Sequence, residues 1–289
     1  MKKLKILFLV LIVTIVTVNI SAQEVIEPPK YPDGVYTKEN SRTRRAIPYP
    51  TLREADVMWS KRVWRVIDLR EKMNHPLYYP DEKIFDRKSL FDVIKDAAMI
   101  DGTITCFDNP LTDDEFRFDM TKTEIENLLV SWDSTNTVED VNNPGVQLVA
   151  PLKKDITTEK VWKYWVKEDW FFDKQRSVLD VRIIGLCPLV EKLTEGGEAT
   201  GGDKALFWVY FPEARPVFAN QEVYMRHNDA ERRTFEDIFW KRMFSSYVRK
   251  ESNVYNRGIL DYKTGLDVLL ESERVKHDIF ICEHDLFHF

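Results

Sequence analysis

The clearest hydrophobic pattern in the chain is a pair of apolar runs on either side of a short polar break. Both runs lie between Val161 and Val190, are rich in aromatic and β-branched residues, and are separated by Asp173–Ser177. This composition is typical of two antiparallel strands and their turn. From Val178 to Cys187 the apolar residues fall on both alternating sets of positions, which predicts a strand covered on both faces. The hairpin is therefore predicted to be the centre of the fold.

Apolar residues spaced three and four positions apart predict helices before this hairpin. The segment Thr51–Met73 has such spacing over its whole length, and its first residues have the spacing of a capping box. Two more helices are predicted, from Ser89 to Asp101 and from Thr121 to Trp132. The N-terminal half is thus expected to be mostly helical.

After the hairpin, the pattern alternates between loops, strands and helices. Thr194–Asp203 holds four of the ten glycines and is expected to be a flexible loop. Strands are predicted over Ala205–Phe211 and Val217–Ala219. A helix capped by Thr234 and continuing to Val248 is apolar over so much of its circumference that it should be buried on two sides. A last helix is predicted from Thr264 into the apolar tail.

Together these elements predict an α+β fold, with an antiparallel β-sheet built on the central hairpin, packed by helices, and with a mostly helical N-terminal half. Composition divides the 289 residues further. The expected regions are a signal peptide (1–22), an extended Pro-rich arm (23–50), a mostly helical N-terminal region (51–132), a linker (133–158) and an α+β C-terminal region (159–289).

The first residues have the pattern of a secretory signal peptide. Three lysines precede the apolar run Ile6–Val18, and Ser21-Ala22 gives a small-residue cleavage site. Thirteen apolar residues fall short of the roughly 20 that a membrane-spanning helix needs, which disfavours a membrane anchor. No cysteine lies near this site. A lipid-anchored N-terminus is therefore not expected, and the chain should be exported.

The charge balance limits the possible partners. The whole chain has a net charge of −6, and loss of the three signal-peptide lysines leaves the mature chain near −9. This acidity argues against binding to nucleic acid or to an anionic membrane surface, because both attract lysine and arginine. The three cysteines are odd in number and lack metal-ligand spacing, so they are expected to pack as buried thiols.

The Pro-rich arm carries a small basic cluster in an otherwise acidic protein, consisting of Arg42, Arg44 and Arg45. One interpretation is a solvated leader. The other is an arm that docks on the acidic surface of a partner, with apolar contacts from Ile47, Tyr49 and Leu52. The sequence leaves both open.

Three features of the sequence are candidates for a metal, sugar-binding or catalytic site. His284 and His288 are four residues apart and could share a zinc ion, although Asp285 is short for a metalloprotease base. The aromatic residues between Trp162 and Phe172 could form a sugar-binding platform, but at strand spacing they are more often core. Glu168 and Asp169 face opposite sides of a strand, so a bulge or strand-edge role is favoured over acid–base catalysis. No cofactor and no catalytic residue are predicted, and a secreted metal-dependent hydrolase or carbohydrate-binding protein is the alternative function.

Long, idiosyncratic stretches of the chain resemble one known family. They are Asp56–Pro80, Glu168–Pro188, Phe207–Gly258 and the tail LLESERVKHDIFICEHDLF. All four are similar to the N component of the gliding-motility and type IX secretion machinery, the GldN/PorN family. The resemblance covers nearly all of the mature chain.

This resemblance implies a periplasmic, non-enzymatic subunit without catalytic residues. It also implies a ring formed with a GldK/PorK-type lipoprotein at the inner face of the outer membrane, and contacts with the motor proteins of the GldL/PorL and GldM/PorM types. A closed ring needs two different contact surfaces on each copy. We expect one on the N-terminal helix and arm, with Met58 and Trp64, and the other on the C-terminal helix, with Trp240 and Phe244.

Overall fold

The fold is built on a seven-stranded antiparallel sheet. In a computed structural model, residues 44–286 are described except 85–86, 109, 112–113, 134–136, 140–146, 150–151, 194–198, 227 and 229. In spatial order the strands are β11 (Tyr247–Glu251), β1 (Val57–Asp68), β7 (Val161–Asp173), β8 (Val178–Leu193), β10 (Trp208–Tyr210) and β2 (Cys106–Phe107), and β9 (Ala199–Ala205) pairs with β8. The α+β class is confirmed.

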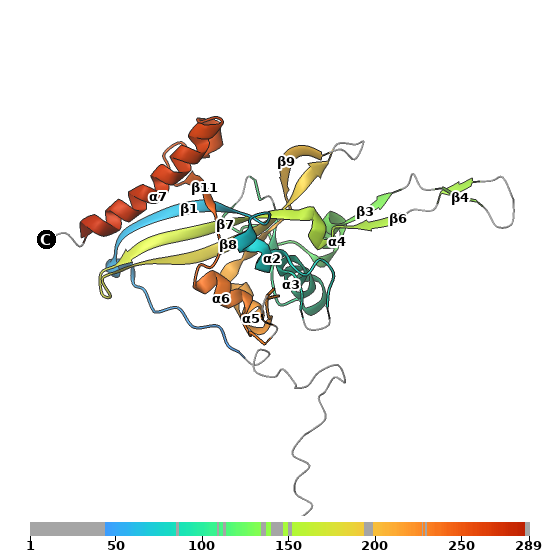
Figure 1. The fold of residues 1–289 in the computed structure, drawn as a ribbon, viewed down its shortest axis with the longest axis horizontal. Coiled ribbons are helices and arrows are strands. Elements are labelled where there is room, and N and C mark those ends of the chain that lie inside the picture. Colours follow the sequence, from blue (N-terminus) through green and yellow to red (C-terminus); the bar gives the residue numbers. More distant parts are fainter. Residues whose placement is uncertain are drawn as a thin grey trace, which may run out of the picture. The chain divides into compact units, whose positions relative to one another are not determined.

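Helices flank the sheet (Figure 1). They are α2 (His75–Tyr78), α3 (Leu90–Asp96), α4 (Lys122–Leu129), α5 (Phe211–Asn220), α6 (Phe235–Trp240) and α7 (Leu266–Leu286), and one π turn, Ala97–Asp101, extends α3. Outside the main sheet, β3 (Val130–Asp133) pairs with β6 (Leu152–Asp155), and β4 (Thr137–Glu139) pairs with β5 (Gln147–Val149). Strands β1 and β11 lie beside α7, while α5 and α6 lie near β8.

The predicted central hairpin is confirmed. Strands β7 and β8 pair from Val161 opposite Val190 to Asp173 opposite Val178. The polar break forms the turn, where the carboxylate of Asp173 accepts hydrogen bonds from the backbone N–H of Gln175 and from the guanidinium of Arg176. The expected coverage on both faces holds for the inner part of β8, whereas Val178 beside the turn is exposed.

The helix predicted over Thr51–Met73 is wrong. Most of this segment is strand β1, which pairs with β7 on one side and β11 on the other. Its residues Val63–Ile67 are all buried because both faces of the sheet are covered there. A continuous apolar run fits a buried helix and a buried strand equally well, and the β-branched and aromatic content decides for the strand.

Three predictions after the hairpin also fail. The long helix from Thr234 ends as α6 at Trp240, a turn with Arg242 at φ 52° follows, and the expected last part of the helix is edge strand β11. The expected strand Val217–Ala219 lies inside α5, whose first turn contains Pro212. Of the expected loop Thr194–Asp203, the described part is strand β9. The helix predicted from Thr264 is present as α7.

Several sequence predictions fall wholly or partly outside the described residues. These are the signal peptide, the arm up to residue 43, and the turn at Asn142–Gly145. The segment 133–158, interpreted as a linker, contains strands β4, β5 and β6 among its described residues. The proposed boundaries between regions stay predictions.

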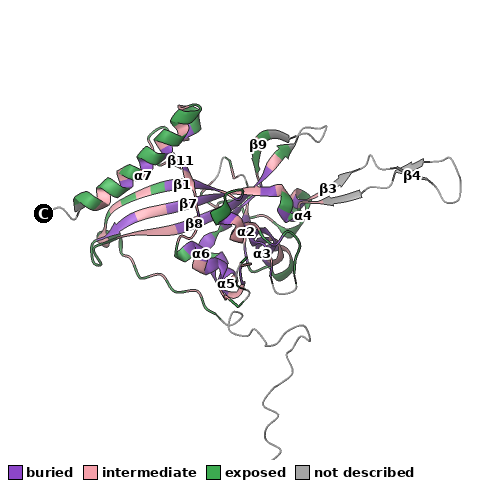
Figure 2. Cartoon of the chain, in the orientation of Figure 1, coloured by how far each residue is buried: buried purple, intermediate pink, exposed green. Residues whose placement is uncertain are grey.

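Apolar residues pack on both faces of the sheet, and many residues of its central strands are buried (Figure 2). On one face Val66, Trp165 and Cys187 lie in register on neighbouring strands and pack together. On the other face Val166 and Leu186 join the largest cluster, to which α3, α5 and α6 contribute. Central strands with apolar neighbours on both faces explain the continuous hydrophobic runs in the sequence.

The cysteines act as packing residues in this core. All three thiols are free, and Cys106 and Cys187 are buried. Burial raises the pKa of the Cys106 thiol to about 12, and it also raises the pKa of Cys187. Both thiols are therefore protonated and unreactive at neutral pH.

A buried carboxylate connects three parts of the fold. Glu168 is fully buried in β7 and forms ion pairs with Arg65 of β1 at 3.2 Å and with Arg242 of the α6–β11 turn at 3.0 Å. The indole N–H of Trp170 donates to the same carboxylate at 3.0 Å. The register with β8 shifts between Lys167 and Glu168, which agrees with the predicted bulge. This one carboxylate therefore joins β1, β7 and the turn into β11.

Replacing Glu168 with Gln tests this connection. We expect Glu168→Gln to lower the free energy of unfolding by about 3–5 kcal/mol, because it leaves two partly or fully buried guanidinium groups without their counter-charge. The matched control is Asp169→Asn, because Asp169 forms a partly exposed pair with Arg62 and should contribute at most about 1 kcal/mol. Urea unfolding of the mature chain measures both. Equal, small effects of the two substitutions would contradict the role given to Glu168.

Candidate functional site

The best-formed candidate site lies where the arm crosses helices α5 and α6 and the outer part of β8. The guanidinium of Arg44 binds the carboxylate of Asp237 at 2.8 Å. Further along, the carbonyl oxygen of Ile47 accepts a hydrogen bond from Arg215, and that of Pro50 accepts one from Arg182 at 2.6 Å. Three arginine contacts in seven residues hold the arm on the body of the protein.

Tyr49 is the central side chain of this contact. Its ring stacks on Trp240, with 5.5 Å between ring centroids. The guanidinium carbons of Arg215 and Arg182 lie 3.9 Å and 4.9 Å from the Tyr49 ring centroid. Burial raises the pKa of the Tyr49 hydroxyl above its ordinary value, although Arg215 opposes this shift. A ring between two guanidinium groups and an indole is a strong anchor, because each such contact is worth about 0.5–1 kcal/mol or more.

Local sequence explains why α6 presents its groups here. Thr234 and Asp237 form a capping box at the start of α6. The Asp237 carboxylate accepts hydrogen bonds from the backbone N–H of Thr234 and from Arg44, and the Thr234 hydroxyl accepts one from the backbone N–H of Asp237. Burial opposes ionisation of Asp237, but the hydrogen bonds from Thr234 and Arg44 outweigh it and lower its pKa. At neutral pH the carboxylate is therefore charged and available to the arm.

A buried ion pair joins α5 to α6 under the arm. Arg215 donates two hydrogen bonds to one carboxylate oxygen of Glu236, and both side chains are less than 10% exposed. The second oxygen of Glu236 is buried and accepts no hydrogen bond from the residues that the structure describes. Burial raises the pKa of Glu236, and the hydrogen bonds and positive charge of Arg215 counteract that shift. This oxygen can accept a hydrogen bond from a donor group of a molecule that enters the site.

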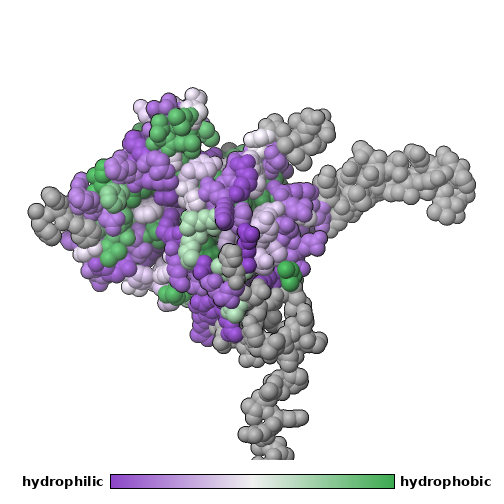
Figure 3. Space-filling view, viewed as in Figure 1, coloured by the Kyte–Doolittle hydropathy of each residue, from purple (hydrophilic) through white to green (hydrophobic). Residues whose placement is uncertain are grey.

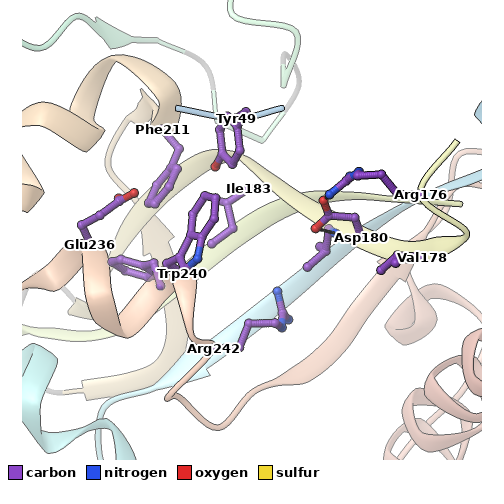
Figure 4. Close-up of a pocket in the computed structure, with 11 residues that line it drawn as sticks. Tyr49, Arg176, Val178, Asp180, Ile183, Phe211, Glu236, Trp240 and Arg242 are labelled. Carbon is purple, nitrogen blue, oxygen red and sulfur yellow. Dashed lines mark hydrogen bonds and ion pairs between the residues drawn. The ribbon is translucent and has the colours of Figure 1, made fainter. Parts of the chain in front are cut away.

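A cavity of about 260 Å³ opens beside this ion pair. In Figure 4, Tyr49, Trp240 and Ile183 lie around its middle, Glu236 stands at one end, and the Arg176–Asp180 pair stands at the other. The remaining lining residues are Val178, Val181, Phe211, Phe239 and Arg242. Aromatic and aliphatic walls with a few charged groups suit the insertion of a side chain or a small apolar group. Because Tyr49 forms one wall, the arm is part of the site.

The structure distributes the predicted partner-binding residues unevenly. Arg42 lies outside the described residues. Arg45, Met58 and Trp240 are exposed, the latter two at 60% and 41%. Trp64 and Phe244 are both 7% exposed, because strand β1 is central and Phe244 packs on Phe239. The contact surfaces expected on two helices are therefore not formed as expected, although partner binding itself stays a prediction.

Arg44 and Tyr49 also have contacts other than those expected. The sequence left open a solvated leader or an arm that docks on the acidic surface of a partner, and in the structure Arg44 binds Asp237 of its own chain. The sequence did not identify Arg215 or Glu236, which lie 21 residues apart on two helices. The only signal for Glu236 was its place in the first turn of a helix, where acids are common for another reason.

The features behind the alternative functions find little support. Helix α7 contains His284, while His288 lies outside the described residues, and within those described no three His, Cys, Asp or Glu side chains are grouped to hold a metal. The aromatic residues of β7 are divided between the two faces of the sheet, and Tyr164, Trp165, Phe171 and Phe172 are buried. They are core residues and do not form an open platform for a sugar.

Comparison with known proteins gives a family match over nearly the whole described part of the chain. The family model described as gliding motility associated protein GldN matches residues 52–288. No curated protein matches the chain. The match begins just after the arm and includes the hairpin, α7 and every residue that lines the cavity except Tyr49.

Replacing Tyr49 with Ala tests the anchoring of the arm. We expect Tyr49→Ala to increase the rate of tryptic cleavage after Arg45 and Arg53 by about tenfold, because cleavage follows the population in which the arm is detached. Ile47→Ala is the matched control, since its side chain is 56% exposed and only its backbone contacts Arg215. Limited proteolysis followed by mass spectrometry measures the rates. An unchanged rate for Tyr49→Ala would show that the ring does not anchor the arm.

Proposed function

We propose that the chain, which belongs to the GldN family, is a non-enzymatic structural subunit. Members of this family are components of the gliding motility and type IX secretion machinery. In this proposal, mature copies form a periplasmic ring with a GldK/PorK-type lipoprotein at the outer membrane. The ring also contacts the inner-membrane motor proteins of the GldL/PorL and GldM/PorM types. In this proposal the subunit acts by binding the neighbouring proteins of the ring and the motor.

The observation that carries the proposal is the number of large apolar side chains left exposed on separate elements. Single exposed apolar residues are normal on any protein, but groups of them are typical of contact surfaces. They include Ile47 on the arm, Met58 on β1, Trp240 on α6, Val254 and Tyr255 after β11, and Leu266, Leu269, Leu270 and Phe280 on α7. An assembly subunit needs such surfaces, whereas a solitary soluble protein does not.

The two surfaces needed for a closed ring can be reassigned from the structure. The arm and Trp240 are in contact through Tyr49, so they belong to one surface. Met58, exposed at the register shift near the start of β1, is assigned to the second. Trp64 and Phe244, both 7% exposed, are assigned to neither surface.

The proposed location follows from the export signal and the lack of an anchor in the part described. Among the residues that the structure describes, no helix is long and apolar enough to cross a membrane. The acidic mature chain also has little attraction for anionic lipid. Attachment to the outer membrane through a lipoprotein satisfies both conditions.

Co-purification with the lipoprotein partner tests the proposal. We expect the mature chain and the lipoprotein to elute together at a mass many times that of one copy. Trp240→Glu and Met58→Glu should each reduce the recovered complex at least tenfold, because a charge would be buried in the contact. Leu111→Glu, at a 73% exposed position that is assigned to neither surface, is the control.

Deletion of the gene gives an independent measurement. If the proposal is correct, deletion stops the export of surface proteins and the spreading of colonies. A mature chain that stays monomeric with the lipoprotein present, or a deletion strain with normal export, would contradict it.

A further inference from the structure

Helix α7 has two apolar faces, and among the described residues only one of them packs against the rest of the chain. The inner face packs Val275 and Ile279 against Val63 of β1 and Val248 of β11. The hydroxyl of Ser272 accepts a hydrogen bond from the backbone N–H of Val248 at 2.8 Å. These contacts fix the position and rotation of the helix on the edge of the sheet.

The outer face of α7 carries a second stripe of apolar residues. At about 100° per residue, these side chains lie on the side of the helix opposite Val275. They are Leu266, Leu269, Leu270, Phe280 and Ile281, whose exposed fractions run from 40% for Ile281 to 70% for Leu266. Figure 2 shows the outward side of α7 as exposed, and Figure 3 shows hydrophobic side chains over its upper end. The described residues leave this stripe uncovered.

The outer stripe is nearly symmetric about the level of Val275. Leu269 and Ile281 each lie six residues from this centre, and Leu270 and Phe280 each lie five residues from it. Glu273 and His277, both exposed, lie two residues on either side. Reversing the direction of the helix therefore places four of the five apolar residues on apolar residues and the carboxylate on the imidazole. Leu266 is the exception, because His284 lies at the matching position nine residues after the centre.

We propose that two copies of this chain pair through α7 in an antiparallel arrangement with a two-fold axis at the level of Val275. In this pair Leu269 and Leu270 of one copy lie against Ile281 and Phe280 of the other. Glu273 of each copy faces His277 of the other, so the two-fold axis generates the polar contact twice. A parallel pair in register would instead place Glu273 against Glu273, which is unfavourable.

The symmetry of the stripe is the reason for choosing a second copy as the occupant. A helix that binds an unrelated protein has no need to match its own reverse, whereas a two-fold contact requires it. The stripe follows the spacing of three and four residues used by helices that pack side by side. At about 1.5 Å per residue the helix is about 30 Å long, which is enough for three heptads.

This contact does not depend on the proposed ring. It closes after two copies, whereas the ring surfaces are different from each other and continue from copy to copy. It is therefore tested on the purified mature chain with no lipoprotein present. Loss of the pair would leave the ring proposal standing, and the reverse also holds.

The first test measures the dimer dissociation constant by analytical ultracentrifugation over a concentration series up to about 100 µM. The wild-type chain is expected to form dimers. Leu270→Glu and Phe280→Glu should each raise the dissociation constant about 30-fold or more, as expected for central contact residues. Ile100→Glu is the control, since it places the same charge at an exposed apolar position after α3. A monomeric wild type, or dimers insensitive to both α7 variants, would overturn the proposal.

The second test concerns direction and register. His277→Glu should weaken the dimer by opposing two carboxylates, and the double variant Glu273→Lys with His277→Glu should restore it. For cross-linking, Cys282→Ser removes the nearby native thiol. In that background a short bis-maleimide should join the Leu269→Cys variant to the Ile281→Cys variant, and neither variant to itself. Cross-linking of Leu269→Cys to itself, or no rescue by the double variant, would overturn the antiparallel pair.

Discussion

The fold depends on a carboxylate that is fully buried and paired. Moving an ionised carboxylate out of water is so unfavourable that Glu168 is tolerated only with its counter-charges in place. Arg65 and Arg242 supply those charges from β1 and from the turn after α6. Arg242 has a left-handed backbone there, which ends α6 and directs the chain into β11. The edge of the sheet, and with it the support of α7, therefore follows from one ion-pair cluster.

A second buried ion pair, between Arg215 and Glu236, organises the region under the arm. Arg215 satisfies Glu236, binds the backbone of the arm and packs on Tyr49 with the same guanidinium. One side chain thus joins α5, α6 and the arm. Arg242 lines the cavity beside this pair and also binds Glu168, so the two charged clusters are neighbours. A substitution or ligand that moves Arg242 at the cavity should consequently alter its ion pair with Glu168 at the centre of the sheet.

The sequence predicted the elements whose pattern has a single interpretation. The β7–β8 hairpin has apolar runs and a polar turn that only a hairpin satisfies, and α3, α4 and α7 have clear spacing or caps. Strand β1 was mistaken for a helix because its burial on both faces removes the alternation that marks a strand. The end of α6 could not be predicted either. The turn that follows the helix is held by the ion pair between Arg242 and Glu168, which lies 74 residues away in the sequence. For the same reason the arm site was predicted only as far as Arg44 and Tyr49, and its buried partners were missed.

Strand β11 would by itself present an open row of backbone groups, the usual starting point for uncontrolled joining of sheets between molecules. Helix α7 runs along this strand, and Ser272 occupies the outward N–H of Val248. A strand from another molecule cannot pair with this N–H, because Ser272 already binds it and α7 occupies the space beside β11. Copies at high local concentration can therefore contact one another through the side chains of α7 without joining their sheets into fibres.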